Sequence, residues 1–248
     1  MSAAAVFGVD IGGSGVKGAP VDPDTGRLLA ERERFETPQP ATPEAVARVV
    51  ADLLLEFSWK GPVGVTVPAV VQRGVVRTAA NIDPSWIGCD FAGLLAEDHG
   101  IEATVLNDAD AAGVAEMRHG AGRDRRGTVV LATLGTGIGT AVFVDGVLVP
   151  NTELGHLQMH GDAAERYAAA RVRKAEDLSW GEWAERLDEY VHELGKLLWP
   201  DLVILGGGVS RRAEKWLDKL TADIEVVPAE LQNNAGIVGA AMAAVAAG

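Results

Sequence analysis

The stretch VFGVDIGGSGVKGAPVD, residues 6–22, decides the fold prediction for this chain of 248 residues. An apolar run at Val6–Val9 leads into the glycine-rich turn of residues 12–15, and a second apolar run follows at Val16–Val21. Two β-forming runs on either side of a short glycine turn are typical of a β-hairpin. We therefore expect a strand, a tight turn and a second strand at this end of the chain.

The same pattern returns 123 residues later. Thr128–Leu134 is a strongly β-forming run that meets a second glycine-rich turn at residues 135–139. An internal repeat of this kind predicts two lobes of common ancestry that face each other across a cleft. A chance match in a glycine-rich chain is the alternative. The aligned pairs are Asp10 with Thr133, Gly12 with Gly135 and Asp22 with Asp145.

Glycine-rich turns can bring backbone N–H groups close to a phosphate, because no side chain intervenes. The second turn is followed by the β-forming run Thr140–Val144 and not by a helix, which excludes the dinucleotide-binding fingerprint. No Gly-Lys-Ser or Gly-Lys-Thr sequence occurs, so a Walker P-loop is excluded as well. Two interpretations remain: the hairpin tips grip phosphate, or the glycines only make tight turns.

The residues beside the first turn favour phosphate binding. Asp10 would hold Mg²⁺ through water, because Mg²⁺ keeps much of its hydration shell and bridges phosphates. Lys17 would add a positive charge next to them, although a solvated lysine on a hairpin is the alternative. The candidate phosphate-binding residues of the turn itself are Gly12, Gly13, Ser14 and Gly15.

A second candidate site lies at Asn107-Asp108, between a predicted strand at 103–106 and a predicted helix at about 110–119. An ionised aspartate at a helix start can accept the proton of a hydroxyl group that attacks phosphorus. The alternative is an ordinary helix N-cap, a position that Asp and Asn both fill well. His156, in Glu153-Leu154-Gly155-His156, has no partner at zinc-like spacing, and a structural histidine is the simpler interpretation.

Three further helix signals can be read locally. Thr42-Pro43 has the form of an N-cap followed by proline in the first turn. Ser179 and Glu182 have the spacing of a capping box ahead of a helix that runs to about Trp199. A helix is also predicted near 211–220.

Composition limits the partners and the compartment. The chain has 22 Lys and Arg against 35 Asp and Glu, a net charge of −13, which argues against a nucleic-acid partner bound by bulk charge. Cys89 is the single cysteine, so no intramolecular disulfide and no zinc site of several thiolates can form. The longest apolar run, Ala240–Ala247, is far shorter than the ~20 residues of a membrane span, and no secretory signal is seen. We expect a cytoplasmic protein without a membrane partner.

Six motifs, taken in order, resemble those of the ROK sugar kinases in the actin-like ATPase superfamily. The resemblance covers essentially the whole chain and implies an α/β, two-lobed actin-like (ribonuclease H-like) fold with a cleft between the lobes. We expect a small N-terminal lobe at 1–108 and a larger one at 109–248, with a last helix at about 236–248 that packs back onto the first lobe. The motifs are GVDIGGSGVKG (8–18), LNDADAAGVAE (106–116), TLGTGIGTAVFVDG (133–146), ELGH (153–156), VILGGGVS (203–210) and AGIVGAAMAA (235–244).

The resemblance also implies roles for individual residues. Asp108 would be the general base, and Glu165 would take the place of a last sugar-binding glutamate, with an exposed helical glutamate as the alternative. The implied sugar-binding residues are Asn81, Asn107, Asp108, Glu153, His156 and Glu165. The implied phosphate- or nucleotide-binding residues outside the first turn are Thr133, Gly135, Thr136, Gly137, Gly207 and Gly208.

The chain departs from the family pattern after Gly155-His156, where most members carry a cysteine-rich zinc site and this chain has LQMHGDAAERYAAA. This zinc-free version is similar to compact actinobacterial members that phosphorylate glucose with inorganic polyphosphate. The resemblance thus implies Mg²⁺, polyphosphate and ATP as donors, and glucose, with mannose not separable from it. An ATP-only hexose or amino-sugar kinase, a silent sugar-binding regulator and a polyphosphate hydrolase are the alternatives.

A chain-like donor requires a longer cationic track than ATP does, and the best local candidate contains Arg118, Arg125 and Arg126. An ordinary solvated surface is the alternative for each basic cluster. Two further clusters are Arg171, Arg173 and Lys174, and Arg211, Arg212 and Lys215. Exposed Trp and Leu on the predicted 179–199 helix are compatible with a homodimer.

Overall fold

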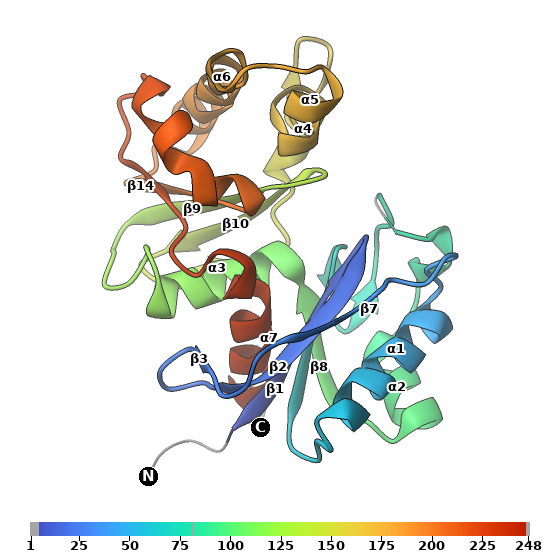
Figure 1. Ribbon diagram of the computed structural model, residues 1–248. Helices are drawn as coiled ribbons and strands as arrows, with labels where there is room; N and C mark the ends of the chain where they lie inside the picture. The colour runs from blue at the N-terminus through green and yellow to red at the C-terminus, as the bar shows by residue number, and fades with distance from the viewer. Residues whose placement is uncertain (1–4, 81, 247–248) are drawn as a thin grey trace. The chain divides into compact units, whose positions relative to one another are not determined.

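The computed structural model describes residues 5–80 and 82–246, which form two compact units (Figure 1). Unit 1 comprises Met1–Ala115 and Asn234–Gly248, and unit 2 comprises Glu116–Asn233. The division falls inside helix α3 (Asp108–His119), later in the chain than the expected boundary after residue 108. The last helix, α7 (Ala235–Ala246), belongs to unit 1.

Unit 1 is built on a six-stranded mixed sheet with the order β3-β2-β1-β5-β8, in which β4 also pairs with β2. The predicted hairpin is confirmed, since β1 and β2 are antiparallel, whereas β5 and β8 continue the sheet in parallel. The strands are β1 Val6–Gly12, β2 Gly15–Asp22, β3 Arg27–Leu28, β4 Glu33–Phe35, β5 Val63–Val67 and β8 Ala103–Asn107, with a separate pair β6 Val71–Gln72 and β7 Val75–Val76.

One face of this sheet packs on α1 (Pro43–Glu56) and α2 (Phe91–His99). Phe7 and Val9 point to this side and are fully buried in a core that includes Leu53 of α1. The helix signals read from the sequence are confirmed here: the Thr42 side chain accepts a hydrogen bond from Ala45 N at 3.3 Å, and Pro43 lies in the first turn. The short helix η1 (Pro84–Trp86) adds Trp86 to the same core.

The other face of the sheet is covered by α7, and Figure 1 shows the sheet between α7 and the pair α1 and α2. Two neighbouring strands present glycine to this helix. A Cβ on Gly8 would lie 1.9 Å from Ile237 O, and one on Gly64 would lie 1.8 Å from Ala240 O. The helix therefore approaches the sheet at a distance that only glycine permits.

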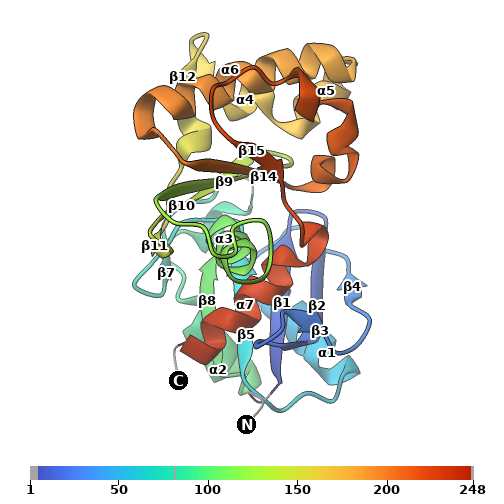
Figure 2. The same ribbon diagram turned by 90° about the vertical axis from the view of Figure 1, so that its left-hand side faces the viewer.

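Unit 2 contains a five-stranded sheet with the order β11-β10-β9-β14-β15. Figure 2 shows its three helices in a layer over one face of this sheet. The helices are α4 Glu165–Ala168, α5 Ala170–Ala175 and α6 Trp180–Leu198. The strands are β9 Thr128–Leu134, β10 Ile138–Val144, β11 Val147–Val149, β14 Leu202–Gly206 and β15 Val226–Pro228, with a separate pair β12 Gln158–Met159 and β13 Asp162–Ala163.

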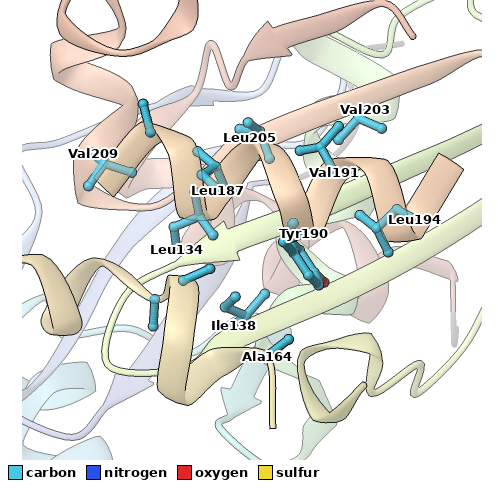
Figure 3. Close-up of a cluster of buried hydrophobic side chains, with 14 of the residues drawn as sticks. Leu134, Ile138, Ala164, Leu187, Tyr190, Val191, Leu194, Val203, Leu205 and Val209 are labelled. Carbon is cyan, nitrogen blue, oxygen red and sulfur yellow. The ribbon is translucent and has the colours of Figure 1, made fainter. Parts of the chain in front are cut away.

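Large side chains fill the core between α6 and this sheet (Figure 3). Leu187, Tyr190 and Leu194 of α6 meet Val203 and Leu205 of β14, all fully buried. The capping box at the start of α6 is confirmed, with both reciprocal hydrogen bonds between Ser179 and Glu182 present.

The helix predicted near 211–220 is present as two 3₁₀ helices, η3 (Gly208–Lys215) and η4 (Leu217–Lys219). It is not one continuous helix, because Arg212 leaves the helical region at φ −127° and ψ 30°. Two other short 3₁₀ helices are η2 (Leu154–His156) and η5 (Gln232–Asn234).

The two sheets repeat one topology, since β2-β1-β5-β8 and β10-β9-β14-β15 have the same order and the same directions. Asp10 and Thr133 occupy equivalent positions on β1 and β9. Counted between equivalent register pairs, the second hairpin is one residue shorter, because Asp10 pairs with Lys17 whereas Thr133 pairs with Gly139. The expected match of Asp22 with Asp145 is therefore out of register by one residue.

Candidate functional site

The first glycine turn is held from outside by two side chains. Thr37 Oγ1 donates a hydrogen bond to Gly12 O at 2.6 Å, and the Arg34 guanidinium donates to Ser14 O. Gly13 and Ser14 are exposed at the tip, and a Cβ on Gly13 would meet no other atom within 4 Å. The backbone here is thus fixed in place while its tip remains open to a ligand. Arg34 and Thr37 belong to no motif, so the sequence alone did not point to them.

Asp10 lies next to this turn, on the face of the sheet that α7 covers. Its Oδ1 accepts a hydrogen bond from Thr66 Oγ1 at 3.2 Å, and its Oδ2 lies 3.5 Å from Lys17 Nζ. A Cβ on Gly236 would lie 2.9 Å from Asp10 Oδ1, so the first turn of α7 borders the carboxylate. The structure brings together Asp10 and Lys17 as expected and adds Thr66, which the sequence did not indicate.

Asn107 is the cap of α3, and it makes the hydrogen bonds that an N-cap requires. Its Oδ1 accepts from Ala109 N at 2.8 Å and from Asp110 N at 2.9 Å, and its Nδ2 donates to Ala69 O at 3.0 Å. Asp108 follows as the first helical residue, half-buried, and its Oδ1 accepts from Ala109 N at 2.9 Å. The cap interpretation therefore applies to Asn107 and not to Asp108.

A cavity of about 270 Å³ opens beside the first glycine turn within unit 1. That volume lies just below the roughly 300–1,000 Å³ of pockets for drug-sized ligands, so it suits a small molecule. Asn81, a predicted sugar-binding residue, lies outside the described residues, although its chain neighbours line the cavity. The lining residues are Gly12, Gly13, Thr37, Gln39, Pro40, Ala41, Pro68, Ala80, Ile82 and Asp83.

The second glycine turn, in unit 2, is held by backbone contacts. Gly135 N donates to Gly137 O at 3.0 Å across the turn, and Arg171 N at the start of α5 donates to Gly135 O at 3.0 Å. Gly207, with φ +82°, packs against Leu134, where a Cβ would lie 2.3 Å from Leu134 O. Gly135 and Thr136 are exposed, so this tip is also open.

The ELGH segment is attached to the same hairpin by a pair of threonines. Thr140 Oγ1 donates to Thr152 O at 2.7 Å and accepts from Leu154 N at 3.1 Å. Thr152 Oγ1 donates in return to Thr140 O at 3.0 Å. Gly155 packs so closely that a Cβ would lie 2.1 Å from Ile138 O. Thr140 and Thr152 thus position Glu153, and no sequence motif pointed to them.

Glu153 and His156 lie together in this segment, with His156 Nδ1 3.7 Å from Glu153 Oε2. Partial burial raises the pKa of the Glu153 carboxyl; His156 opposes this effect and the charge of Glu165 adds to it. Glu165 itself is half-buried and accepts a hydrogen bond from Ile138 N at 3.3 Å, so it is not an exposed helical glutamate. The structure therefore brings Glu153, His156 and Glu165 together around the second hairpin.

The segment after ELGH forms the β12–β13 hairpin. Met159 is buried in the core of unit 2. His160 at the turn lies 2.7 Å from Glu189 Oε2 of α6, and Tyr167 Oη donates to Glu189 Oε1 at 2.9 Å. Packing and hydrogen bonds to α6 therefore hold this loop. Across residues 5–80 and 82–246, no three His, Cys, Asp or Glu side chains form a group that could hold a metal ion.

The basic residues predicted to guide a polyanion do not share one environment. Arg118 and Arg126 are exposed. Arg125 is paired with Glu225 across the sheet of unit 2, so its charge is already compensated. In the part of the chain that the structure describes, no helix has the length and apolar character needed to cross a membrane.

Comparison with known proteins agrees with this geometry. The ROK family model matches residues 6–170, and the chain belongs to the ROK family. The polyphosphate glucokinase of Mycobacterium tuberculosis (strain H37Rv) is 54% identical over 241 residues, which cover 97% of this chain and 91% of that protein. The similarity thus extends over both units and every motif.

Solved structures give the same result. The inorganic polyphosphate/ATP-glucomannokinase of Arthrobacter sp. strain KM superposes with a TM-score of 0.96 at 49% identity, over 99% of this chain and 100% of that one. A ROK family glucokinase from Streptomyces griseus, in complex with glucose and AMPPNP, superposes with a TM-score of 0.83 at 26% identity, over 96% and 98%. The expected mixed α/β fold of the actin-like sugar kinases is confirmed.

Proposed function

We propose that the protein transfers a phosphoryl group from inorganic polyphosphate or ATP to the 6-hydroxyl of glucose. The observation that carries this proposal is the 54% identity to a polyphosphate glucokinase, which extends over 97% of the chain and includes both glycine turns and Asp108. The likeness to a glucomannokinase that uses polyphosphate and ATP supports both donors. Mannose is a second acceptor to be tested.

Asp108 is the proposed general base. Its carboxylate accepts the proton as the O–H bond of the attacking hydroxyl breaks, the new O–P bond forms and the P–O bond to the donor breaks. The backbone N–H of Ala109 lies 2.9 Å from Asp108 Oδ1 and fixes that oxygen at the start of α3. Because Asn107 caps the helix, Asp108 is not required for that purpose.

The sugar-binding proposal rests on groups that can both donate and accept hydrogen bonds, as sugar hydroxyls require. Glu153, His156 and Glu165 supply a carboxylate, an imidazole and a second carboxylate around one hairpin. Among the described residues, Asn107 makes three structural hydrogen bonds, which leave one of its amide N–H groups for a sugar hydroxyl. Asn81 remains in the proposal on resemblance alone.

The glycine turns are proposed to hold the phosphoryl groups, with Mg²⁺ beside Asp10. Mg²⁺ is usually bound through one or two carboxylates, with water and phosphate oxygens as its other ligands, so the single carboxylate of Asp10 fits that donor set. Bound there, Mg²⁺ would neutralise charge on the phosphates. Lys17 lies 3.5 Å from Asp10 Oδ2 and adds a second cation at the same place. The N–H groups of the turns would stabilise the charge that develops during transfer.

The test is a coupled assay that crosses polyphosphate and ATP with glucose, mannose and N-acetylglucosamine. Sugar phosphate formation from glucose with both donors is expected. Product from ATP alone would indicate an ATP-only sugar kinase, and phosphate release without sugar would indicate a hydrolase.

The Asp108→Asn variant tests the base directly. General-base catalysis typically contributes about 10²–10⁴-fold, and kcat is expected to fall by that factor with a small change in the KM for glucose. Unchanged turnover would assign the catalytic role elsewhere and revive the interpretation as a silent sugar-binding regulator. Circular dichroism and thermal melting check that the variant is folded.

The proposal places the protein in the cytoplasm and treats it as a homodimer. The single cysteine suits a reducing compartment. Leu197 and Trp199 at the end of α6 are 57% and 85% exposed, which supports an interface there. Analytical ultracentrifugation of the protein and of Trp199→Ser tests the dimer, and a monomeric wild type would refute it.

A further inference from the structure

Two basic segments that are distant in sequence lie together in unit 2. The first is α5, ARVRKA, which carries three cations and no acid, and the second is η3, GVSRRAEK, which carries three cations and Glu214. We call their six cations the α5–η3 patch. Its members are Arg171, Arg173 and Lys174 of α5, and Arg211, Arg212 and Lys215 of η3.

Trp180, the first residue of α6, joins the two segments. The Arg173 guanidinium lies 4.2 Å from the centre of the Trp180 ring, and the ammonium of Lys215 lies 5.9 Å from the same centre. Both are within the range of cation–π attraction. Arg173 also donates a hydrogen bond to Leu178 O at 3.1 Å. The Trp180 ring therefore positions one cation from each segment, Arg173 of α5 and Lys215 of η3.

Below Trp180, two more tryptophans make this arrangement rigid. Trp180 and Trp183 have ring centres 5.8 Å apart, and Trp183 and Trp216 have centres 6.1 Å apart, both edge to face. Trp183 Nε1 donates to Ala168 O at 3.0 Å, and Trp216 Nε1 donates to Val209 O at 3.1 Å. These contacts hold α4, α6 and η3 together, so the cations lie on a preorganised scaffold.

Both segments begin beside the second glycine turn. Arg171 N donates to Gly135 O at 3.0 Å, so α5 starts at that turn. Gly207, directly before η3, packs against Leu134, the last residue ahead of the turn. An anion held at this tip would therefore have the α5–η3 patch next to it.

The charges of the patch are not compensated within the chain. None of its six cations forms an ion pair with a carboxylate anywhere in residues 5–80 and 82–246, whereas Arg125 is paired with Glu225. The two segments together carry six cations and one carboxylate, that of Glu214, whereas the whole protein has a net charge of −13. A long polyanion can contact more of these cations at once than a triphosphate can.

We propose that the α5–η3 patch binds the part of the polyphosphate chain that extends beyond the phosphoryl group being transferred. This inference rests on the proposed function, because it concerns the donor of that reaction. It replaces the track of Arg118, Arg125 and Arg126 expected from local sequence. Arg171, at the glycine turn, contacts the chain first, and Lys174, Arg211 and Lys215 contact it beyond the turn.

The test uses the full chain with Lys174→Gln and Arg211→Gln combined, one exposed cation from each segment. The KM for long-chain polyphosphate is expected to rise about tenfold and the KM for ATP to rise less, since three phosphates make fewer contacts with the patch than a long chain does. The preference for long-chain polyphosphate over tripolyphosphate should shrink, and the KM for the long chain should depend less steeply on salt. Turnover with ATP and glucose also shows that the variant is folded.

A matched control removes the same charge elsewhere: Arg48→Gln with Lys60→Gln, two exposed cations of unit 1. It should leave the KM for polyphosphate within about twofold, since surface charges far from a ligand are screened. A rival variant, Arg118→Gln with Arg126→Gln, tests the earlier expectation.

The outcomes distinguish a failure of the proposed polyphosphate donor from a failure of the α5–η3 patch as its binding site. A wild type that uses ATP but not polyphosphate refutes the proposed donor itself. A wild type that uses polyphosphate, together with a patch variant that behaves like the control, refutes only the α5–η3 patch. A polyphosphate-specific loss in the rival variant alone would also overturn it.

Discussion

The two glycine hairpins share one topology and differ in chemistry at the position of Asp10 and Thr133. On β1, Asp10 pairs with Lys17 on one side and with Thr66 on the other. The equivalent residue of β9, Thr133, pairs with Gly139 and Gly206. At this position the sheet of unit 1 has two charged side chains, whereas the sheet of unit 2 has an uncharged threonine between two glycines. Equal topology therefore places two turns in equivalent positions without making them equivalent sites.

The same comparison extends to the way each sheet packs. Gly8 and Gly64 are register partners on β1 and β5, and α7 presses on both. Their counterparts on β9 and β14 are Leu131 and Ile204, also register partners and buried. In unit 1, glycines without side chains let α7 pack closely on the sheet. In unit 2, the matched positions carry large buried side chains.

The largest difference between the two hairpins is expected when the charge of Asp10 is removed. Asp10→Asn should lower kcat about 10²–10³-fold and raise the Mg²⁺ concentration needed for half-maximal activity, because a charge-stabilising group is lost. Thr133→Val, its counterpart, should change kcat less than about threefold because no charge is removed. Initial rates at varied Mg²⁺ measure both. Equal losses would mean that the two hairpins do the same chemical work.

The packing difference predicts opposite responses to size. Gly64→Ala should reduce the free energy of unfolding by about 1–3 kcal/mol, because the added methyl group overlaps the backbone of α7. Ile204→Val, at the matched interior of unit 2, should cost about 0.5–1.5 kcal/mol because a methyl group is removed. Urea unfolding measures both. A Gly64→Ala variant as stable as wild type would contradict the close approach of α7.

A smaller effect is expected on the pH dependence of stability, through Glu153 of unit 2, which has no counterpart in unit 1. Partial burial raises the pKa of Glu153 in the folded state, so folding favours its protonated form. Its contribution to stability is therefore full below the unfolded pKa and is lost as pH rises through the higher folded value. Glu153→Gln should flatten the fall of Tm as the pH rises above about 4, and an identical pH profile would show that Glu153 does not titrate there.

The smallest effect is expected in the core of Figure 3. Tyr190 is fully buried on α6, and among the described residues its hydroxyl has no hydrogen-bond partner. Burial without a partner raises the pKa of Tyr190 and disfavours the hydroxyl itself. Tyr190→Phe should leave Tm unchanged or raise it, and the free energy of unfolding should rise by up to about 1 kcal/mol. A clear loss of stability in thermal melts would indicate that the hydroxyl is paired in solution.

Local signals in the sequence were sufficient for much of the fold. Hairpins, the Thr42 cap and the Ser179–Glu182 capping box depend on neighbours within a few residues, and all are present. The 3₁₀ form of the helix predicted near 211–220 was not foreseen, because an apolar and basic pattern does not reveal the backbone break at Arg212. The out-of-register match of Asp22 with Asp145 came from counting residues across a turn of unknown length.

Long-range contacts were beyond the reach of the sequence. The Thr140–Thr152 pair that positions Glu153 has no motif, and the ion pair of Arg125 with Glu225 joins residues 100 apart. The clusters containing Arg173 and Lys215 were recognised separately, but their meeting on Trp180 depends on tertiary packing. Residue types could suggest which groups carry chemistry, and only the fold could say which of them stand together.

The return of α7 to unit 1 has a consequence for synthesis. The ribosome makes β1, β5 and β8 first, then all of unit 2, and α7 only afterwards. Until then the glycines of β1 and β5 face no helix, whereas unit 2 already has every strand and helix of its own. The order in which the units are completed during translation is therefore the reverse of the order in which they begin.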